Sequence, residues 1–571
     1  MASSPRNFQN AKRRMFTLLM GLDVLVGTVL FIIFILPRSE PGNQWVLGLS
    51  ATRFLAGMFF LLFLLANLGV FLLAARDFGL WQAGPGRTAM GLLAQYQTPI
   101  LVALYAVLTL TGAFLLLVIP PIIRPLAFLE PIAGRFGTLI GWIFLTTLLY
   151  IIMLRLLAAE ALHNNPVVAQ LDELLTLVGL FLVVFVLYAH IAALIGWINK
   201  TRYSYWNLLA GQFLQGKLFL ERPPYTHDLT MYDGRWYVPM PPLPAILMMP
   251  LAYLIGAQNI STSYLSMAFS AVNGLLMFLI LRQISARSWV DLSKGGIFLL
   301  VSIFLFGTPH LWVGISGRAW FVSQILTVTF LALAIYGALR SWSAWWIGTL
   351  IALAILARPN SLMTWPFVLA ISMQLLKEDR GKASLKDALF WSLKTALPIV
   401  LAALGLLFYN YLRFDSILDF GYTTLNGNPD ILRNAQTYGV FSPHFVLTNL
   451  KVMLFRLPRV NWGGQWPIAP STVGMSVFLT TPPLLYLFRR YPKQWWILGA
   501  WVAVLFNIIL LSLYHNTGAD QFGYRYILDM LVPIVTLLAL ALEKRVPWHF
   551  IVLAVVSIGI NIYGTNWFMN A

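Results

Sequence analysis

The sequence predicts an all-α polytopic membrane protein. Of its 571 residues, 59% are hydrophobic and only 10% are charged, and the mean hydropathy is +0.77. Apolar runs of the length that a helix needs to cross a bilayer, about 20 residues, recur along the whole chain. A transmembrane β-barrel would instead show short strands of alternating polarity. The pattern therefore favours a helical bundle with about 15–16 membrane segments.

The charge of the chain indicates its orientation rather than a nucleic-acid partner. The formal net charge is +18, which in a soluble protein would suggest nucleic acid. Here the basic residues fall in short loops between apolar runs, the pattern that sets orientation in a membrane. The chain has no cysteine, so it forms no disulfide and performs no thiol chemistry.

The first four apolar segments are expected at about 15–36, 52–75, 98–120 and 136–158, as an N-terminal four-helix membrane module over residues 1–171. The first segment follows a basic flank and is too long for the apolar core of a signal peptide, so we interpret it as an uncleaved span with a cytoplasmic N-terminus. Asp23 lies inside this span but near its cytoplasmic end, where it can reach water, and the module shows no residues that indicate chemistry.

A fifth helix is expected at about 172–198, which would place the polar stretch 199–240 outside. Two amphipathic pieces are expected in this loop. Residues 203–215 have helical periodicity and should lie at the membrane interface with Tyr and Trp as anchors. The next piece breaks at a proline pair, and Asp233–Gly234 marks a tight turn.

The remaining apolar segments complete a core over 172–412 and a C-terminal set of helices over 474–571, separated by a long outer loop at 413–473. These segments lie at about 241–257, 263–281, 296–315, 319–339, 343–357, 360–376, 393–412, 474–488, 495–514, 526–542 and 548–568.

The positions of the basic loops conflict with a simple count of the membrane spans. All of them should face the cytoplasm, yet the loop after Arg282 falls outside if both 241–257 and 263–281 span. The short segment 241–257, with Pro250 inside it, is our candidate for a re-entrant or interfacial piece. The alternative is that the charge rule fails at that one loop.

Two acids in the first outer loop are candidates for chemistry. A carboxylate at the membrane surface could act as general base on an incoming hydroxyl. Asp228 is the first candidate and Asp233 the second. The alternative for both is a loop acid that caps a turn, and Asp233, which precedes Gly234, fits that alternative well.

Four arginines stand at the expected outer ends of apolar segments: Arg318, Arg358, Arg413 and Arg525. The planar guanidinium pairs well with phosphate, although each side chain could simply extend to the interface. Positive charge is disfavoured on the outer side, so we expect at least one of them to bind phosphate. The histidines show no metal-ligand spacing. No metal site or cofactor is therefore expected, with a divalent cation left open, and no nucleotide-binding motif is present.

From about residue 172 onward, an ordered set of stretches resembles one family of membrane enzymes. The stretches are YWNLLAGQFLQGKLFL (205–220), YDGRWYVPMPPLPAILMMP (232–250), LARPNSLMTWP (356–366), YNYLRFDSILDFGY (409–422) and QFGYRYILDMLVP (521–533). In this order they resemble the polytopic glycosyltransferases of the GT-C superfamily, of the kind that includes protein mannosyltransferases and aminoarabinose transferases.

The resemblance implies a GT-C-like bundle that moves a sugar from a polyprenyl-phosphate carrier to a lipid, glycan or protein acceptor, with inversion, on the outer face of a bacterial-type inner membrane. In such enzymes an acid of the first outer loop is the base, which matches Asp228 or Asp233. Basic residues hold the lipid phosphate, which matches Arg525 with Arg318, and we add Arg358 and Arg413. The residues expected to contact substrate are Tyr232, Tyr237, Asn410 and Tyr524.

Two rival functions remain. Many members of this family carry an acid just after the first core helix, where this chain reads INKTRYSYWN (198–207). That departure leaves open a catalytically inactive, lipid-binding relative. A transporter or flippase of lipid-linked sugars is the other rival. Transporters often show internal repeats and charges at mid-membrane depth, whereas this sequence shows no clear repeat and its charges cluster at helix ends.

Overall fold

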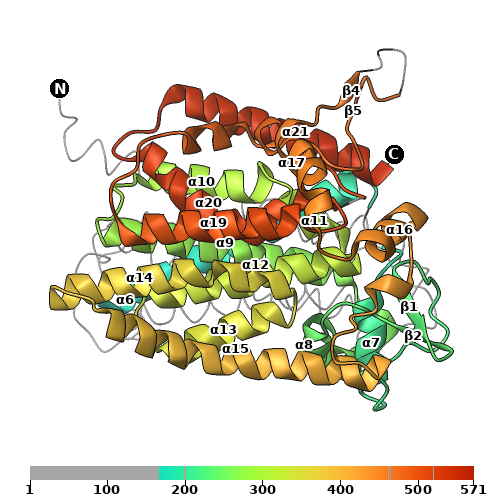
Figure 1. The fold of residues 1–571 in the computed structure, drawn as a ribbon. Helices are drawn as coiled ribbons and strands as arrows, with labels where there is room; N and C mark the ends of the chain where they lie inside the picture. Colours follow the sequence, from blue (N-terminus) through green and yellow to red (C-terminus); the bar gives the residue numbers. More distant parts are fainter. Residues whose placement is uncertain (1–165, 198–200, 461, 463–464, 519, 571) are drawn as a thin grey trace, which may run out of the picture. The chain divides into compact units, whose positions relative to one another are not determined.

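The computed structural model describes residues 166–571 except 198–200, 461, 463–464, 519 and 571 (Figure 1). The chain forms two compact units, Met1–Val183 and Val184–Ala571, and every candidate site residue belongs to the second. The four segments expected before residue 165, together with Asp23, lie outside the described residues, so the N-terminal module stays a prediction.

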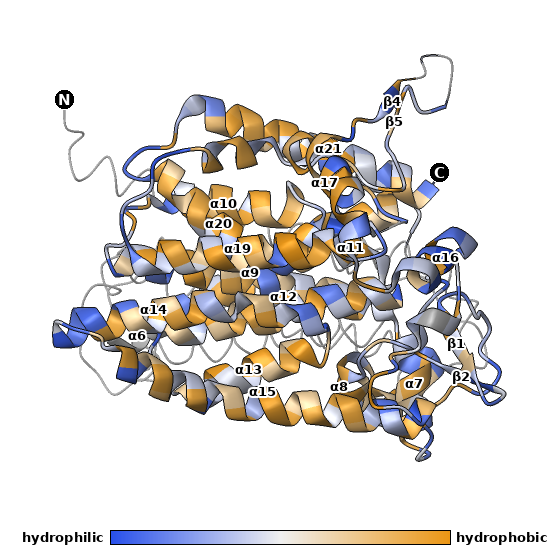
Figure 2. Cartoon of the chain, in the orientation of Figure 1, coloured by the Kyte–Doolittle hydropathy of each residue, from blue (hydrophilic) through white to orange (hydrophobic). Residues whose placement is uncertain are grey.

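Long apolar helices dominate the described part, and seven of them are long and apolar enough to cross a membrane. They are α6 (Pro166–Leu194), α9 (Thr262–Ala286), α12 (Ala319–Leu339), α15 (Leu385–Phe414), α19 (Trp495–Ser512), α21 (Trp548–Asn570) and the continuous run of η7 (Arg525–Met530), α20 (Leu531–Ala539) and η8 (Leu540–Leu542). Figure 2 shows apolar residues along these helices and hydrophilic residues in the loops that connect them. The prediction of a multi-pass helical membrane protein is confirmed.

Several expected segments are too short or too broken to span by themselves. α10 (Lys294–Phe306) and α11 (His310–Ser316) form one span only as a pair bent by 53° at Pro309. The other pieces are α8 (Leu243–Ile255), α13 (Ala344–Ile355), η3 (Pro359–Thr364), α14 (Trp365–Arg380), α18 (Val477–Thr480) and η6 (Pro482–Leu487). Counting apolar runs therefore overestimates the number of membrane spans here, because a short helix buried among other helices is as apolar as a spanning helix.

Local sequence signals explain where several helices begin. Ser384 and Asp387 form a capping box at the start of α15: each backbone N–H donates to the other side chain, at 2.9 and 3.2 Å. The Ser261 and Ser293 side chains accept hydrogen bonds from the first turns of α9 and α10.

The helices alternate in direction, so the connections gather at two ends. We call one the loop end: 201–242, 316–319, 356–364, 415–476 and 513–525. The other, the basic end, comprises 287–293, 340–343, 381–384, 489–494 and 543–547. Hydrogen bonds join distant connections within each end, such as Ala319 N to Tyr203 O at 3.0 Å and Lys544 N to Asp291 O at 2.8 Å.

Helix α8 begins and ends at the loop end. Its Leu243 N donates to Leu356 O, just after α13, at 3.0 Å. Beyond its other end, the Asn207 side chain of α7 (Tyr205–Phe213) donates to Ala257 O at 3.0 Å. α9 then starts at the same end, where Ser263 Oγ reaches Ser316 O. This geometry favours the non-spanning alternative for segment 241–257 and brings all the basic loops of the described part to one end.

The first loop folds around a small sheet of order β2-β1-β3. β1 (Leu229–Tyr232) and β2 (Arg235–Tyr237) form a hairpin, whose tip residues Asp233 and Gly234 both have positive φ, 46° and 69°. β3 (Leu425–Asn426) adds to β1 from the long loop. The two polar loops expected on one side of the membrane are thus hydrogen-bonded to each other.

Two details of the first loop differ from expectation. Its described part contains one helix, α7, because the residues after it pair as strands rather than forming a second amphipathic piece. Tyr205 and Trp206 do not anchor α7 at a surface. They are 1% and 0% exposed and donate hydrogen bonds to His227 O and Ala319 O, which fastens α7 to the protein.

The rest of the long loop contains short elements at the loop end. These are η4 (Tyr422–Thr424), α16 (Pro429–Tyr438), η5 (Pro443–Phe445), α17 (Val446–Phe455) and a two-stranded sheet of β4 (Arg459–Val460) and β5 (Ile468–Ala469). A further turn, η2 (Ala257–Asn259), follows α8.

The topology can be tested by single-cysteine labelling, since the chain has no cysteine of its own. Tyr225→Cys and Gln258→Cys, at exposed positions before and after α8, should react with an impermeant maleimide from the same side of sealed vesicles. Lys382→Cys, at the basic end, should react from the opposite side. Labelling of positions 225 and 258 from opposite sides would show that α8 spans.

Candidate functional site

Asp228 lies at the start of β1 in a strained conformation. Its φ is 59°, in the left-handed region that costs a residue other than glycine about 1 kcal/mol or more. Its backbone N–H donates to Asn426 O at 2.7 Å. The side chain is 24% exposed, and His227 Nε2 lies 3.8 Å from Asp228 Oδ2. A strained acid that still reaches solvent is a candidate for function.

Residues of the long loop lie close to the Asp228 carboxylate. Asn426 donates through its side chain to Thr226 Oγ1 at 2.9 Å, and Gly427 follows directly. A Cβ added to Gly427 would stand 2.5 Å from Asp228 Oδ1, so only glycine allows this approach. Residues about 200 apart in sequence therefore shape the surroundings of one side chain.

Charges from two segments, the first loop and the stretch 520–525, act on Asp228. Burial raises the pKa of Asp228, the protonated His227 ring and Arg525 lower it, and the carboxylate of Asp520 raises it, with a net rise. A carboxyl group whose pKa is raised holds a proton more readily, as a general base requires.

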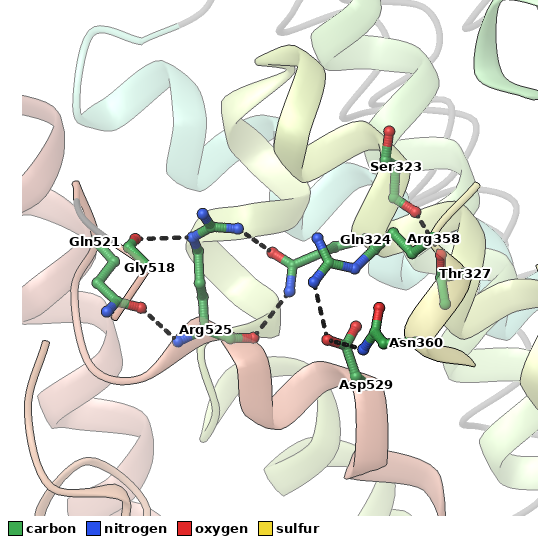
Figure 3. A network of polar contacts seen from close by, with 9 residues as sticks. All are labelled: Ser323, Gln324, Thr327, Arg358, Asn360, Gly518, Gln521, Arg525 and Asp529. Carbon is green, nitrogen blue, oxygen red and sulfur yellow. Dashed lines mark hydrogen bonds and ion pairs between the residues drawn. The ribbon is translucent and has the colours of Figure 1, made fainter. Parts of the chain in front are cut away.

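Arg525, the first residue of η7, is a buried cation held by neutral groups (Figure 3). Its Nε donates to Gly518 O and its Nη1 to Gln324 Oε1, both at 3.0 Å. Gln324 Nε2 donates in return to Arg525 O. Among the described residues no carboxylate pairs with Arg525 within 4 Å. A buried charge without a counter-ion is costly, and this cation is therefore suited to receive an anion.

Arg358 has its own counter-ion. Its Nη2 lies 3.0 Å from Asp529 Oδ2, and the side chains are 17% and 0% exposed. Asn360 Nδ2 donates to the same oxygen at 2.8 Å, as Figure 3 shows. The guanidinium carbons of Arg358 and Arg525 lie 5.4 and 4.6 Å from the centre of one ring, that of Tyr526. The two arginines are thus neighbours, but only Arg358 is neutralised.

Arg318, at the N-terminus of α12, is surrounded by rings. Its guanidinium carbon lies 5.3, 5.7 and 5.4 Å from the ring centres of Trp197, Tyr203 and Phe568. Its Nε is buried without a hydrogen-bond partner among the described residues. Burial lowers the pKa of Arg318. Like Arg525, it lacks a paired carboxylate in the described part of the chain.

Helix α12 connects these features. Arg318 caps it, Gln324 in its second turn holds Arg525, and Phe321 between them packs against the Arg525 guanidinium at 5.3 Å. Trp320 contacts the His227 ring beside Asp228. The first two turns of α12 therefore bring Arg318, Arg525 and Asp228 to one region of the loop end.

Asp233 is not part of this region. It is exposed at the hairpin tip, and the extended strand β1 separates it from Asp228. At roughly 3.3 Å per residue, the four residues of this strand extend over about 13 Å. Asp228 and Asp233 could act together in catalysis only if the loop brought their carboxylates close to each other. The strand between them keeps them apart.

Arg413 and the four tyrosine and asparagine candidates have mainly structural contacts. Arg413 is 2% exposed and donates to Val238 O, Asn410 Oδ1 and Tyr409 O. Asn410, Tyr237 and Tyr524 are buried. Tyr232 donates to Asp415 Oδ2 at 3.2 Å. Their assignment to substrate binding stays a prediction, and nothing in their placement relates them to Asp228.

Several residues of the region were missed from sequence. Asp529 stands four residues after Arg525 inside an apolar run, and an acid within a span is a signal that could have been used. Gln324 is a similar polar residue inside a predicted span. Asp520 and His227 carry no such signal, because polar residues are ordinary in loops.

The described residues contain no group of three or more His, Cys, Asp or Glu that could hold a metal ion. Comparison with known proteins gives no identification either: no protein-family model matches the chain, and no similar curated protein or solved structure is found. The function of the chain is therefore inferred from the geometry of the site and from the resemblance of its motifs.

The Arg358–Asp529 pair should be required for stability. Arg358→Met leaves the Asp529 carboxylate buried without a counter-ion, a loss typically of about 3–5 kcal/mol. We expect a clear fall in the thermal unfolding midpoint of the purified protein. The double variant Arg358→Met/Asp529→Asn should recover part of it, because the uncompensated charge is gone. A single variant as stable as the unmodified protein would contradict this role.

Proposed function

We propose that this chain is a membrane glycosyltransferase that moves a sugar from a polyprenyl-phosphate donor to a hydroxyl acceptor. The observation that carries the proposal is one partly exposed carboxylate, Asp228, held in a strained conformation. It lies within electrostatic range of Arg525, a buried arginine that no carboxylate of the described residues pairs with. The ordered motifs that resemble GT-C enzymes support the same function.

The reaction needs a base and an anion site near each other. Asp228 would take the proton from the acceptor hydroxyl as that oxygen attacks the anomeric carbon. The bond from this carbon to the phosphate oxygen breaks, and polyprenyl phosphate leaves with the electron pair. Negative charge grows on the leaving phosphate, so a fixed cation there stabilises the transition state. One base with direct displacement predicts inversion at the anomeric carbon.

The contacts rank the four arginines for this role. Arg525 and Arg318 have no paired carboxylate among the described residues, so a phosphate would supply the missing charge. Arg358 is neutralised by Asp529, and Arg413 donates to backbone and amide oxygens at the end of α15. We therefore assign the donor phosphate to Arg525 with Arg318, and scaffold roles to the other two.

The proposed function includes a membrane and an orientation in that membrane. Basic loops of the described part lie at one end of the helices and the candidate site at the other, so the charge rule favours a cytoplasmic basic end. The site would then face outward from a bacterial-type inner membrane, where lipid, glycan or protein acceptors are available. The proposed reaction involves no nucleic acid.

A transporter of lipid-linked sugars is the second candidate. The observation in its favour is the buried Arg358–Asp529 pair beside the short helices α8 and α13, because helices that do not cross the whole membrane and carry charged residues nearby mark many transporter sites. Labelled lipid that binds, without transfer from any polyprenyl-phosphate sugar, would favour this function or an inactive lipid-binding relative.

The base can be tested with matched carboxylate variants. In lipid nanodiscs with labelled polyprenyl-phosphate sugars and a membrane acceptor fraction, Asp228→Asn should lower transfer by about 10²-fold or more while donor binding is retained. Asp233→Asn is the control and should remain active. Loss only in Asp233→Asn would reassign the base, and activity in both variants would end the proposal of a base in this loop.

The phosphate contact can be tested by donor binding alone. Arg525→Gln removes the charge, and we expect the Kd for the labelled donor to rise about tenfold, the equivalent of one charge-assisted hydrogen bond. The control is Arg459→Gln, an exposed arginine in β4, which should bind as the unmodified protein does. An unchanged Kd in Arg525→Gln would refute the phosphate role of this residue.

A further inference from the structure

His227 is placed to act on Asp228 rather than on a substrate. Its Nε2 lies 3.8 Å from Asp228 Oδ2, while its side chain is 45% exposed. Its ring lies against Tyr203, with centres 5.3 Å apart, and edge-on to Trp320 at 6.2 Å. Its carbonyl accepts a hydrogen bond from Tyr205 of the buried helix α7. The imidazole is thus fixed on three sides and open to water.

The charged and titratable groups around this pair come from four segments, one of which is η4, whose Tyr422 interacts electrostatically with Asp228. Tyr203 and Tyr205 face His227 from α7 and the residues before it. Arg318, at the start of α12, has its guanidinium carbon 5.7 Å from the centre of the Tyr203 ring. Arg525 and Asp520 act on Asp228 from the loop that leads into η7. Among the described residues, His227 is the cation with a nitrogen within 4 Å of the Asp228 carboxylate.

Resting on the proposed function, in which Asp228 is the base, we propose that His227 is a positioning residue whose positive charge keeps the Asp228 carboxylate ionised. Burial of a carboxylate favours its neutral form, and a base that is already protonated cannot accept a proton. A cation at 3.8 Å opposes that effect of burial. A histidine is charged at low pH, and it is at low pH that a carboxylate takes up a proton.

The direction of the effect can be worked out. Burial raises the pKa of Asp228, and a protonated His227 opposes that rise. Transfer should therefore fall as the pH drops through the pKa of Asp228. Removing the charge at position 227 should move this acid limb of the kcat/KM profile to higher pH. A permanent charge there should not.

Two variants, one neutral and one permanently positive at position 227, provide the test. In His227→Gln the acid limb should move up by about 0.5–1 pH unit, less than for a fully buried pair because His227 is half exposed. In His227→Lys it should stay in place or move down. Both variants lose the ring contacts with Tyr203 and Trp320, so a purely structural role would affect them alike. His444→Gln, an exposed histidine stacked on Tyr438, is the control and should show no shift.

A measurement without turnover separates this inference from the proposed function. In protein labelled with ¹³C at the aspartate carboxyl groups, the Asp228 resonance is the one that disappears in Asp228→Asn. In His227→Gln this carboxyl should titrate at higher pH, because the cation that opposes the effect of burial is gone, and in His227→Lys it should not. A carboxyl shift of this kind without any sugar transfer would support the pairing and overturn the enzyme proposal alone. An unchanged carboxyl titration in His227→Gln, or acid limbs that move the same way in both position-227 variants, would overturn the role of His227.

Discussion

The candidate site depends on the burial of one positive charge, which no carboxylate in the described part of the chain pairs with. Arg525 is 6% exposed, and neutral oxygens of Gly518 and Gln324 hold its guanidinium. The acceptor at Gly518 requires a backbone conformation that glycine provides, with φ at 106°. The acceptor at Gln324 requires the start of α12, and with it the turn that carries Arg318. With the acceptors of Gly518 and Gln324 in place, Phe321 of α12 packs against Arg525 and Trp320 of α12 packs against His227.

Neighbouring arginines show how context decides the role of a side chain. Arg358 and Arg525 share contact with the Tyr526 ring, yet one has a carboxylate within 3.0 Å and the other has amide and carbonyl oxygens. The first is a scaffold whose loss leaves a buried acid unpaired. The second is still able to attract an anion. The sequence shows only an arginine at a helix end in both cases. It cannot tell a neutralised arginine from one without a carboxylate partner, because the partner comes from another part of the chain.

The sequence predicted the helical membrane class, the long spans and the hairpin turn, since each is encoded locally by an apolar run or by Asp233–Gly234. It also identified α8 as a piece that need not span, because Pro250 and its length are local features. What it could not predict is long-range: the pairing of β1 with β3, the partner of Arg358, and the contact of His227 with Trp320. The assignment of Tyr205 and Trp206 as interface anchors was wrong for a related reason, since an amphipathic pattern does not reveal whether protein or lipid covers the apolar face.

The pairing of β1 with β3 has a consequence for biosynthesis. Leu229 and Thr230 find their partners, Asn426 and Leu425, only after nearly two hundred further residues have left the ribosome, and Arg525 emerges later still. Contacts between residues so distant in sequence form late, after the local helices. Asp228 is thus synthesised early but acquires its surroundings only when most of the chain is in the membrane. A nascent or truncated chain that ends before this strand would insert its helices and still lack an assembled site.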